Sequence, residues 1–186
     1  MSKLGWGIIF LCLSGCAENP KVSLLKPASF ESANLLQAWQ FQGRLLIRDT
    51  EALTANIDWQ HTVDKDILKL SGTLGLGAIK LELTKDCIVI ERGFNDVQSS
   101  CDIDAFVAQS VGFVVPVTAL RAWVVGNYLQ GVPVLLAEKG FQQLNWHIVY
   151  KDYMQSSSGT LMPRKLTVKK NNIILKLVID KWDVKQ

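Results

Sequence analysis

Apolar and polar residues alternate with a period of two along most of the chain after residue 40. In the segment FQGRLLIRD, Phe41, Gly43 and Leu45 occupy every second position, and polar residues fill most of the others. This alternation is typical of a β-strand that buries one face. It extends over residues 41–49, 53–61, 66–72, 78–84, 87–101, 133–153 and 164–182. Because the connections are too short for crossovers, we expect roughly ten or eleven antiparallel strands.

Turn-forming residues predict the positions of two hairpins. A hairpin over residues 164–182 turns at Asn171-Asn172, since asparagine tolerates positive φ in a two-residue turn. The resulting pairs are Val168 with Leu175 and Leu166 with Leu177. A second pair of strands turns at Lys139-Gly140. Its later strand is expected to share one face among Leu144, Trp146, Ile148 and Tyr150.

Three segments show helical features. Residues 30–39 follow Ser29, a candidate N-cap, and carry apolar side chains on one face. A second helix is expected over residues 102–111, and a third follows Pro116 and ends at Gly126. The apolar face of a large curved sheet needs a cover or a ligand. We therefore predict a mainly β fold of the α+β class, an antiparallel half-barrel or open β-barrel with about three helices covering an apolar cavity.

The N-terminal segment has a different composition. A single Lys3 precedes the apolar run from Leu4 to Leu13, which is about half the length that a bilayer-spanning helix requires. Such a segment is typical of a secretory signal peptide. Its end, Leu13-Ser14-Gly15-Cys16, resembles the lipobox of bacterial lipoproteins, in which the cysteine thiol receives a diacylglycerol. A plain secretory signal with an incidental cysteine is the alternative interpretation.

The lipobox resemblance divides the chain into three parts. We expect residues 1–15 to be removed as a signal peptide, residues 16–27 to form a tether lipidated at Cys16, and residues 28–186 to form one domain. By resemblance to the sorting of such lipoproteins, Ala17 favours the outer membrane, with the domain facing the periplasm.

The four cysteines fall into classes. Cys12 would be lost with the signal peptide, and Cys16 would be lipidated. Cys87 and Cys101 would face each other if the hairpin between them folds near Phe94. A cross-strand disulfide is therefore predicted in an oxidising compartment, with two free thiols as the alternative.

Residues that could support catalysis or metal binding are scarce. The two histidines, His61 and His147, are assigned to the polar side of their strands and have no metal-ligand spacing with cysteine or carboxylate. Residues 156–159 form a serine-rich loop without a nucleophile elbow. The net charge is only +3 and the basic residues are dispersed, which argues against a nucleic-acid surface. We expect neither an enzyme nor a cofactor or metal site.

The connection SGTLGLGAIK, residues 71–80, carries two leucines where turn residues are normally polar. Its glycines match neither the dinucleotide nor the Walker spacing. Leu74 and Leu76 either fold back into the core or are presented to something apolar. A membrane-tethered protein favours the second interpretation.

Several stretches together resemble the LolB family of outer-membrane lipoproteins. They are LSGC at 13–16, WQ at 59–60, TLGLGAIKLEL at 73–83, VPVTALRAWVVG at 115–126, NWHIVYKDY at 145–153 and LKLVIDKWDV at 175–184. The resemblance implies a half-barrel lidded by helices around an apolar cavity. It also implies a receptor that accepts lipoproteins from a soluble, LolA-like periplasmic carrier and inserts them into the outer membrane.

The resemblance assigns a role to the leucine loop. Family members carry a protruding loop with an exposed leucine before a glycine, and Leu74-Gly75 takes that position as a membrane-insertion element. This chain departs from the commonest form because Thr73 stands where proline is frequent and Leu76 adds a second apolar side chain. Which leucine inserts stays open.

Alternation alone gives the candidate cavity lining: Leu45, Ile47, Ile57, Trp59, Leu81, Trp146 and Ile148. The partners implied are the carrier, the acyl chains of client lipoproteins and outer-membrane lipid, with the chain itself a monomer and no nucleic acid bound. The competing interpretation is an outer-membrane lipoprotein that binds a free lipid or glycolipid, or an assembly scaffold without transfer.

Overall fold

The computed structural model describes residues 36–72, 77–93, 95–111 and 114–185, and these form one antiparallel sheet with two helices. The eleven strands follow the order β6-β5-β4-β3-β2-β1-β11-β10-β9-β8-β7. Their bounds are β1 Ala38–Arg48, β2 Ala52–His61, β3 Asp66–Ser71, β4 Ile79–Leu83, β5 Ile88–Arg92, β6 Asp96–Ser100, β7 Val134–Ala137, β8 Gly140–Gln143, β9 Trp146–Gln155, β10 Leu161–Lys170 and β11 Ile173–Lys185. The helices are α2 Ile103–Val111 and α3 Val117–Val124.

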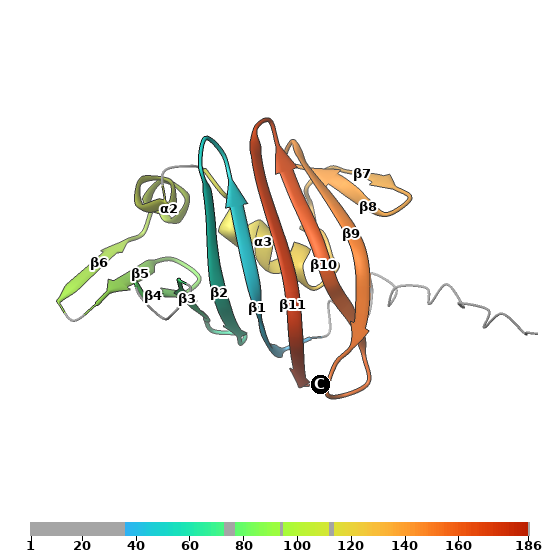
Figure 1. Ribbon diagram of the computed structural model, residues 1–186, viewed down its shortest axis with the longest axis horizontal. Coiled ribbons are helices and arrows are strands. Elements are labelled where there is room, and N and C mark those ends of the chain that lie inside the picture. Colours follow the sequence, from blue (N-terminus) through green and yellow to red (C-terminus); the bar gives the residue numbers. More distant parts are fainter. Residues whose placement is uncertain (1–35, 73–76, 94, 112–113, 186) are drawn as a thin grey trace, which may run out of the picture.

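The sheet is open, with β6 and β7 as its two edges. In Figure 1 the long strands β1, β2 and β9 to β11 run side by side, while β3 to β6 run in a clearly different direction. Helix α3 lies against one face of the long strands, and α2 lies near β3 to β6. The mainly β, antiparallel and unclosed architecture predicted from the alternation is confirmed.

The first and last described strands in chain order, β1 and β11, are neighbours at the centre of the sheet. Strand β1 pairs with β11 from Ala38 opposite Lys185 to Arg48 opposite Ile174, with an irregularity between Gln42 and Gly43. A Cβ atom on Gly43 would collide with the carbonyl oxygen of Val178. This close approach of two backbones explains the glycine in an otherwise apolar face.

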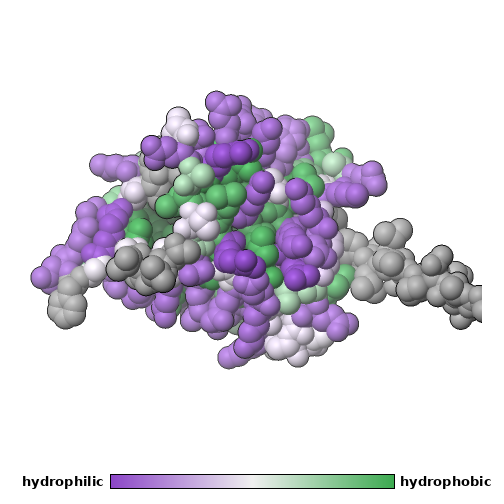
Figure 2. All heavy atoms as spheres, in the orientation of Figure 1, coloured by the Kyte–Doolittle hydropathy of each residue, from purple (hydrophilic) through white to green (hydrophobic). Residues whose placement is uncertain are grey.

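Burial alternates along the strands as the pattern predicts. Trp39 and Phe41 of β1, Trp59 of β2 and Trp182 of β11 are buried and form an aromatic cluster with ring centroids between 5.0 and 5.9 Å apart. The indole N–H of Trp182 donates to the carbonyl oxygen of Pro163, at 2.7 Å. The cluster fills the inner face of the sheet at one end of the central strands. Figure 2 shows the outer face of the sheet, where hydrophilic residues cover much of the surface.

The register predicted for the last hairpin is confirmed. Val168 lies opposite Leu175 and Leu166 opposite Leu177. Asn171 has a φ of 53°, as its place in the turn requires. The predicted helices at 102–111 and after Pro116 are present as α2 and α3.

The predicted helix over residues 30–39 is wrong at its C-terminal end. Ala38 and Trp39 belong to β1, where Trp39 pairs with both His61 and Val184. The apolar side chains of Trp39 and Phe41 are two positions apart and both buried, so period-two pairing with two neighbours overrides the helical spacing. Residues 30–35 lie outside the described residues. Three helices are therefore not confirmed, and neither described helix is long and apolar enough to cross a membrane.

Candidate functional site

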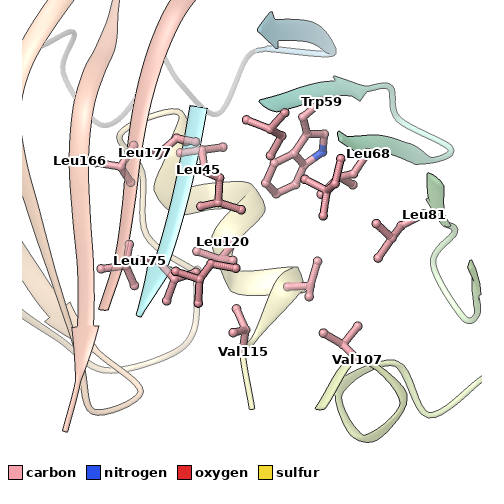
Figure 3. Close-up of a pocket in the computed structure, with 16 residues that line it drawn as sticks. Leu45, Trp59, Leu68, Leu81, Val107, Val115, Leu120, Leu166, Leu175 and Leu177 are labelled. Carbon is pink, nitrogen blue, oxygen red and sulfur yellow. The ribbon is translucent and has the colours of Figure 1, made fainter. Parts of the chain in front are cut away.

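A pocket of about 100 Å³ lies between the concave face of the sheet and the two helices, and every lining residue is apolar (Figure 3). Its floor and sides come from six strands, and its remaining wall comes from α2, α3 and the segment before α3. The lining residues are Leu45, Ile47, Ile57, Trp59, Leu68, Leu70, Leu81, Val107, Val115, Val117, Leu120, Val124, Leu166, Val168, Leu175 and Leu177.

Cross-strand rows build the sheet side of the pocket. Leu166, Leu177 and Leu45 are successive partners across β10, β11 and β1, and Val168, Leu175 and Ile47 form the next row. Neighbouring side chains in such rows lie close enough to make a continuous surface. The alternation therefore produces an apolar wall three strands wide, without any polar group among its lining residues.

Helix α3 supplies the opposing wall. Val117, Leu120 and Val124 lie at positions i, i+3 and i+7, so one helix face points at the sheet. Val107 of α2 and Val115 extend this wall (Figure 3).

Buried hydrogen bonds hold α3 in place. The indole N–H of Trp123 donates to the side-chain oxygen of Gln143, at 3.1 Å, and the Tyr150 hydroxyl donates to the carbonyl oxygen of Trp123, at 2.7 Å. Gln143 is only 1% exposed, and its amide also bonds the backbones of Leu129 and Val132. Burial raises the pKa of the Tyr150 phenol well above its usual value of 10.0, and the nearby Tyr153 raises it further.

A second polar cluster joins α3 to the sheet beside the pocket. Asp66 is 0% exposed and accepts a hydrogen bond from the indole N–H of Trp59, at 3.0 Å. The same oxygen lies 2.8 Å from Nδ1 of His61, and the other oxygen forms an ion pair with Arg121 of α3. One carboxylate therefore fixes both a pocket-lining indole and the helix that covers the pocket.

The sequence interpretation missed this cluster. Asp66 shares the inward face of β3 with Leu68 and Leu70, so its position on that face was the signal that could have revealed a buried carboxylate. The assignment of His61 to the polar side was wrong, because His61 follows Ile57 and Trp59 at period two and stacks near Trp39 with centroids 5.0 Å apart. His147 is exposed, as expected.

Five of the seven candidate cavity residues line the pocket: Leu45, Ile47, Ile57, Trp59 and Leu81. Trp146 and Ile148 do not. Both are buried on the inner face of β9, where Trp146 packs near Trp123 of α3, with centroids 6.4 Å apart, and Ile148 pairs with Phe141.

Other candidate positions fall as follows. Cys87 and Cys101 are joined by a disulfide. Cys16 and the loop residues Leu74, Gly75 and Leu76 lie outside the described residues. In the described ranges there is no group of three or more histidine, cysteine, aspartate or glutamate residues that could hold a metal ion.

Comparison with known proteins assigns the chain to a family. The family model described as "Outer membrane lipoprotein LolB" matches residues 37–182, most of the chain and nearly all of the sheet. The chain belongs to the LolB family. It is 28% identical to the outer-membrane lipoprotein LolB of Shewanella oneidensis, over 95% of this chain and 85% of the relative. The corresponding LolB of Shewanella loihica is 30% identical, over 94% and 84%.

A solved structure is also similar in part. The crystal structure of a DUF1329 family protein from Desulfovibrio piger covers 84% of this chain and 89% of that chain, with 6% identity and a TM-score of 0.37. This likeness is too small to carry an argument.

As a member of the LolB family, the chain is a lipid-anchored lipoprotein of the outer membrane, and its family takes part in lipoprotein localisation.

Proposed function

We propose that this LolB family member accepts lipoproteins from a soluble, LolA-like periplasmic carrier, holds their acyl chains in the apolar pocket and inserts the lipoproteins into the outer membrane. The observation that carries the proposal is the pocket itself, because all of its lining residues are apolar. Such a wall offers burial to hydrocarbon and no partner to a polar headgroup.

The energetics of an acyl chain support this role. At about 0.8 kcal/mol per methylene, a chain of some sixteen carbons carries on the order of 12 kcal/mol of exposure cost in water. A carrier and a receptor must therefore pass the chain from one apolar surface to another. Apolar burial is non-directional, so the membrane interior can replace the pocket as the surroundings of the acyl chain. Transfer then needs only a higher affinity of the acyl chain for the membrane than for the pocket.

Insertion is assigned to the loop between β3 and β4. Leu74 and Leu76 are proposed to contact the lipid surface, and Cys16 to keep the domain at that surface. The proposal gives no residue a catalytic role, since no bond is made or broken in the transfer.

The test is the transfer of a client lipoprotein from its carrier complex to outer-membrane vesicles that contain the lipidated protein. In the Leu74→Glu variant, we expect insertion to fall at least about tenfold while acceptance persists, because moving a charge toward hydrocarbon costs roughly 2–3 kcal/mol. Leu53→Glu is the matched control, since Leu53 is 60% exposed on β2. Leu76→Glu separates the two loop leucines.

Two results would contradict the proposal. Failure of the unmodified protein to accept the client would remove the receptor role. Unchanged insertion by both the Leu74→Glu and Leu76→Glu variants would remove the role of the loop.

A further inference from the structure

Strand register gathers basic side chains on the outer face of the sheet, although they are dispersed along the sequence. In one cross-strand row, Arg48 of β1 lies opposite Ile174 of β11, and Ile174 lies opposite Lys169 of β10. In the next row, Lys176 of β11 lies opposite Leu46 of β1. Arg48, Lys169 and Lys176 are exposed and alternate with inward-facing residues of their strands, so they share the outer face.

Apolar side chains lie between these cations. Ile174 and Leu46 are half-buried on the outer face. Thr167 and Val149 extend the row of Lys176 into β10 and β9, and Val149 is 37% exposed. Long basic side chains can lie along such apolar surface and keep their charged ends in solvent. We call this cluster the outer basic patch, formed by Arg48, Lys169, Lys176, Leu46, Ile174 and Val149.

The cations of the outer basic patch lack counter-charges within the protein. No ion pair joins Arg48, Lys169 or Lys176 to another residue that the structure describes. The next cations on the same face differ in this respect. Arg44 pairs with Asp180, at 3.0 Å, and Lys165 pairs with Asp152, at 3.7 Å. The charge of the patch is therefore available to an anion from outside the protein.

Acidic side chains are distributed unevenly over the outer face. Asp58 and Asp183 pair with residues near the start of β1, whereas the outer basic patch lies near the end of β1. The carboxylates of Asp49 and Glu51 are in the turn between β1 and β2, outside the two cross-strand rows of the patch. The face is thus polarised along its strands, with its unpaired positive charge at one end.

A membrane lies within reach of the patch, because the protein is lipid-anchored in the outer membrane. Cys16 is the proposed anchor site, and residues 17–35 can span at most about 65 Å when fully extended. Strand β1 has 11 residues and is therefore about 36 Å long. The outer basic patch, at the far end of β1 from this segment, can consequently meet the bilayer surface.

The composition of the patch fits such a surface. A membrane that contains anionic phospholipids attracts basic side chains by about 1 kcal/mol for each Lys or Arg near the surface. Phosphate oxygens accept charge-assisted hydrogen bonds from Arg and Lys. The apolar side chains between the cations gain from contact with the boundary between headgroups and acyl chains.

We propose that the outer basic patch binds anionic phospholipid headgroups of the membrane in which the lipoprotein is anchored. Contact through the outer face directs the inner face, with its pocket, away from the bilayer. This inference goes beyond the proposed function and does not depend on what the pocket binds.

Partition into vesicles tests the patch. The mature chain with Cys16→Ser contains every described residue and has no lipid of its own, so its binding reports the protein surface. Vesicles of phosphatidylcholine are compared with vesicles of an equal mixture of phosphatidylcholine and phosphatidylglycerol. The test variant is Lys169→Glu/Lys176→Glu. The matched control, Lys181→Glu/Lys185→Glu, makes the same change in net charge at exposed positions near the other end of β11.

We expect the unmodified chain to bind the mixed vesicles, and Lys169→Glu/Lys176→Glu to lower its partition coefficient at least about tenfold. The control should lower it less than about threefold, because its sites lie more than a screening length from the patch. Lys169→Arg/Lys176→Arg keeps the charge and should bind like the unmodified chain. Added sodium chloride should weaken the binding, since salt screens exposed charges.

The lipidated protein in the same mixed vesicles tests the orientation. A fluorophore is attached to Thr167→Cys on the outer face or to Thr118→Cys on α3, and Cys87 and Cys101 do not compete for the label because they form a disulfide. Lipids with a nitroxide on the headgroup then quench the fluorophores that lie near the bilayer surface. We expect stronger quenching at Thr167→Cys than at Thr118→Cys.

Four results would overturn the inference. They are equal losses of partition in the two Glu variants, equal binding of the unmodified chain to both kinds of vesicle, no binding to either kind, and stronger quenching at Thr118→Cys. Unchanged vesicle binding by Lys169→Glu/Lys176→Glu, with weaker acceptance from the carrier, would assign the patch to an acidic protein partner instead. None of these results measures acyl-chain binding, so the proposed function is tested separately by the transfer assay.

Discussion

Asp66 is the residue on which two parts of the site converge. Its carboxylate is fully buried, and it binds Trp59 and His61 of β2 and Arg121 of α3. A buried charge is tolerated only when its partners compensate for lost hydration. Removing the charge should therefore loosen the pocket wall and the helix above it together.

The Asp66→Asn substitution keeps the shape of the side chain and removes its charge. We expect the free energy of unfolding to fall by about 1–3 kcal/mol, because the amide cannot compensate the Arg121 guanidinium. Arg121 is one third exposed, and water at its outer side keeps the loss below that of a fully buried pair. Urea denaturation followed by tryptophan fluorescence measures the change.

Asp180→Asn is the matched control. Its ion pair with Arg44 joins side chains that are 53% and 60% exposed, so its loss should be below about 1 kcal/mol. Equal losses in the two variants would contradict the role given to Asp66.

At the residue scale, the period-two alternation indicates which side chains face inward, including the polar ones. Leu45, Ile47, Ile57, Trp59 and Leu81 were placed at the pocket by period two alone. The same rule puts His61 and Asp66 on the inward face, yet polar identity led to an outward assignment for His61. A polar residue at an inward position indicates a buried partner, and finding that partner required the position of α3.

Among the elements, the turn between β8 and β9 shows what pattern reading cannot supply. Leu144 was expected in a strand with Trp146, but Leu144 and Asn145 both have positive φ, at 53° and 62°, and form a two-residue turn. Leucine is rare in this conformation, whereas asparagine and glycine are typical. The turn is imposed by the pairing of the flanking strands, which the local sequence does not disclose.

This turn yields a prediction. The Leu144→Asn substitution should raise the free energy of unfolding by about 1 kcal/mol, because asparagine tolerates the left-handed conformation and Leu144 is already 43% exposed. Leu135→Asn, at an exposed leucine in an extended strand, is the control and should give no gain. Thermal unfolding of both variants gives the comparison, and a loss of stability in Leu144→Asn would contradict the strain assigned to the turn.

The start of β1 is a second case at the element scale. The spacing of apolar residues before residue 40 fits a helix, but Trp39 is held by pairing with β2 and β11 at once. Trp146 and Ile148 illustrate the same point from β9, since both are buried as expected and yet neither lines the pocket: Trp146 packs near Trp123 of α3, and Ile148 lies opposite Phe141 of β8. The position of the helices on the sheet determines which inward-facing residues line a cavity. This position depends on tertiary packing and not on the local sequence.

For the molecule as a whole, the open antiparallel sheet followed from short connections and alternation. Both are local properties, so fold class could be predicted from the sequence. The extent of the pocket could not, because it depends on the buried amide of Gln143 and the carboxylate of Asp66 that position α3 over one part of the concave face.

The pairing of β1 with β11 also determines how this molecule comes to be folded. These strands are the first and last of the described chain, and they meet at the centre of the sheet from Ala38 opposite Lys185 onward. Contacts of such long sequence separation are slow to form, because the loop between them must close first. The β1–β11 pair cannot form until residues 173–185 have been synthesised.

A C-terminal truncation should therefore split the sheet at its middle instead of trimming an edge. We expect a chain that ends at Asn172 to lack cooperative urea unfolding and the near-ultraviolet signal of the aromatic cluster, which loses Trp182. A synthetic peptide of residues 173–185, added in excess, should restore both by filling the gap between β1 and β10. Cooperative unfolding of the truncated chain alone would show that the two halves are independent. Strand β11 is therefore needed to complete the core, because it joins β1 to β10 in the middle of the sheet.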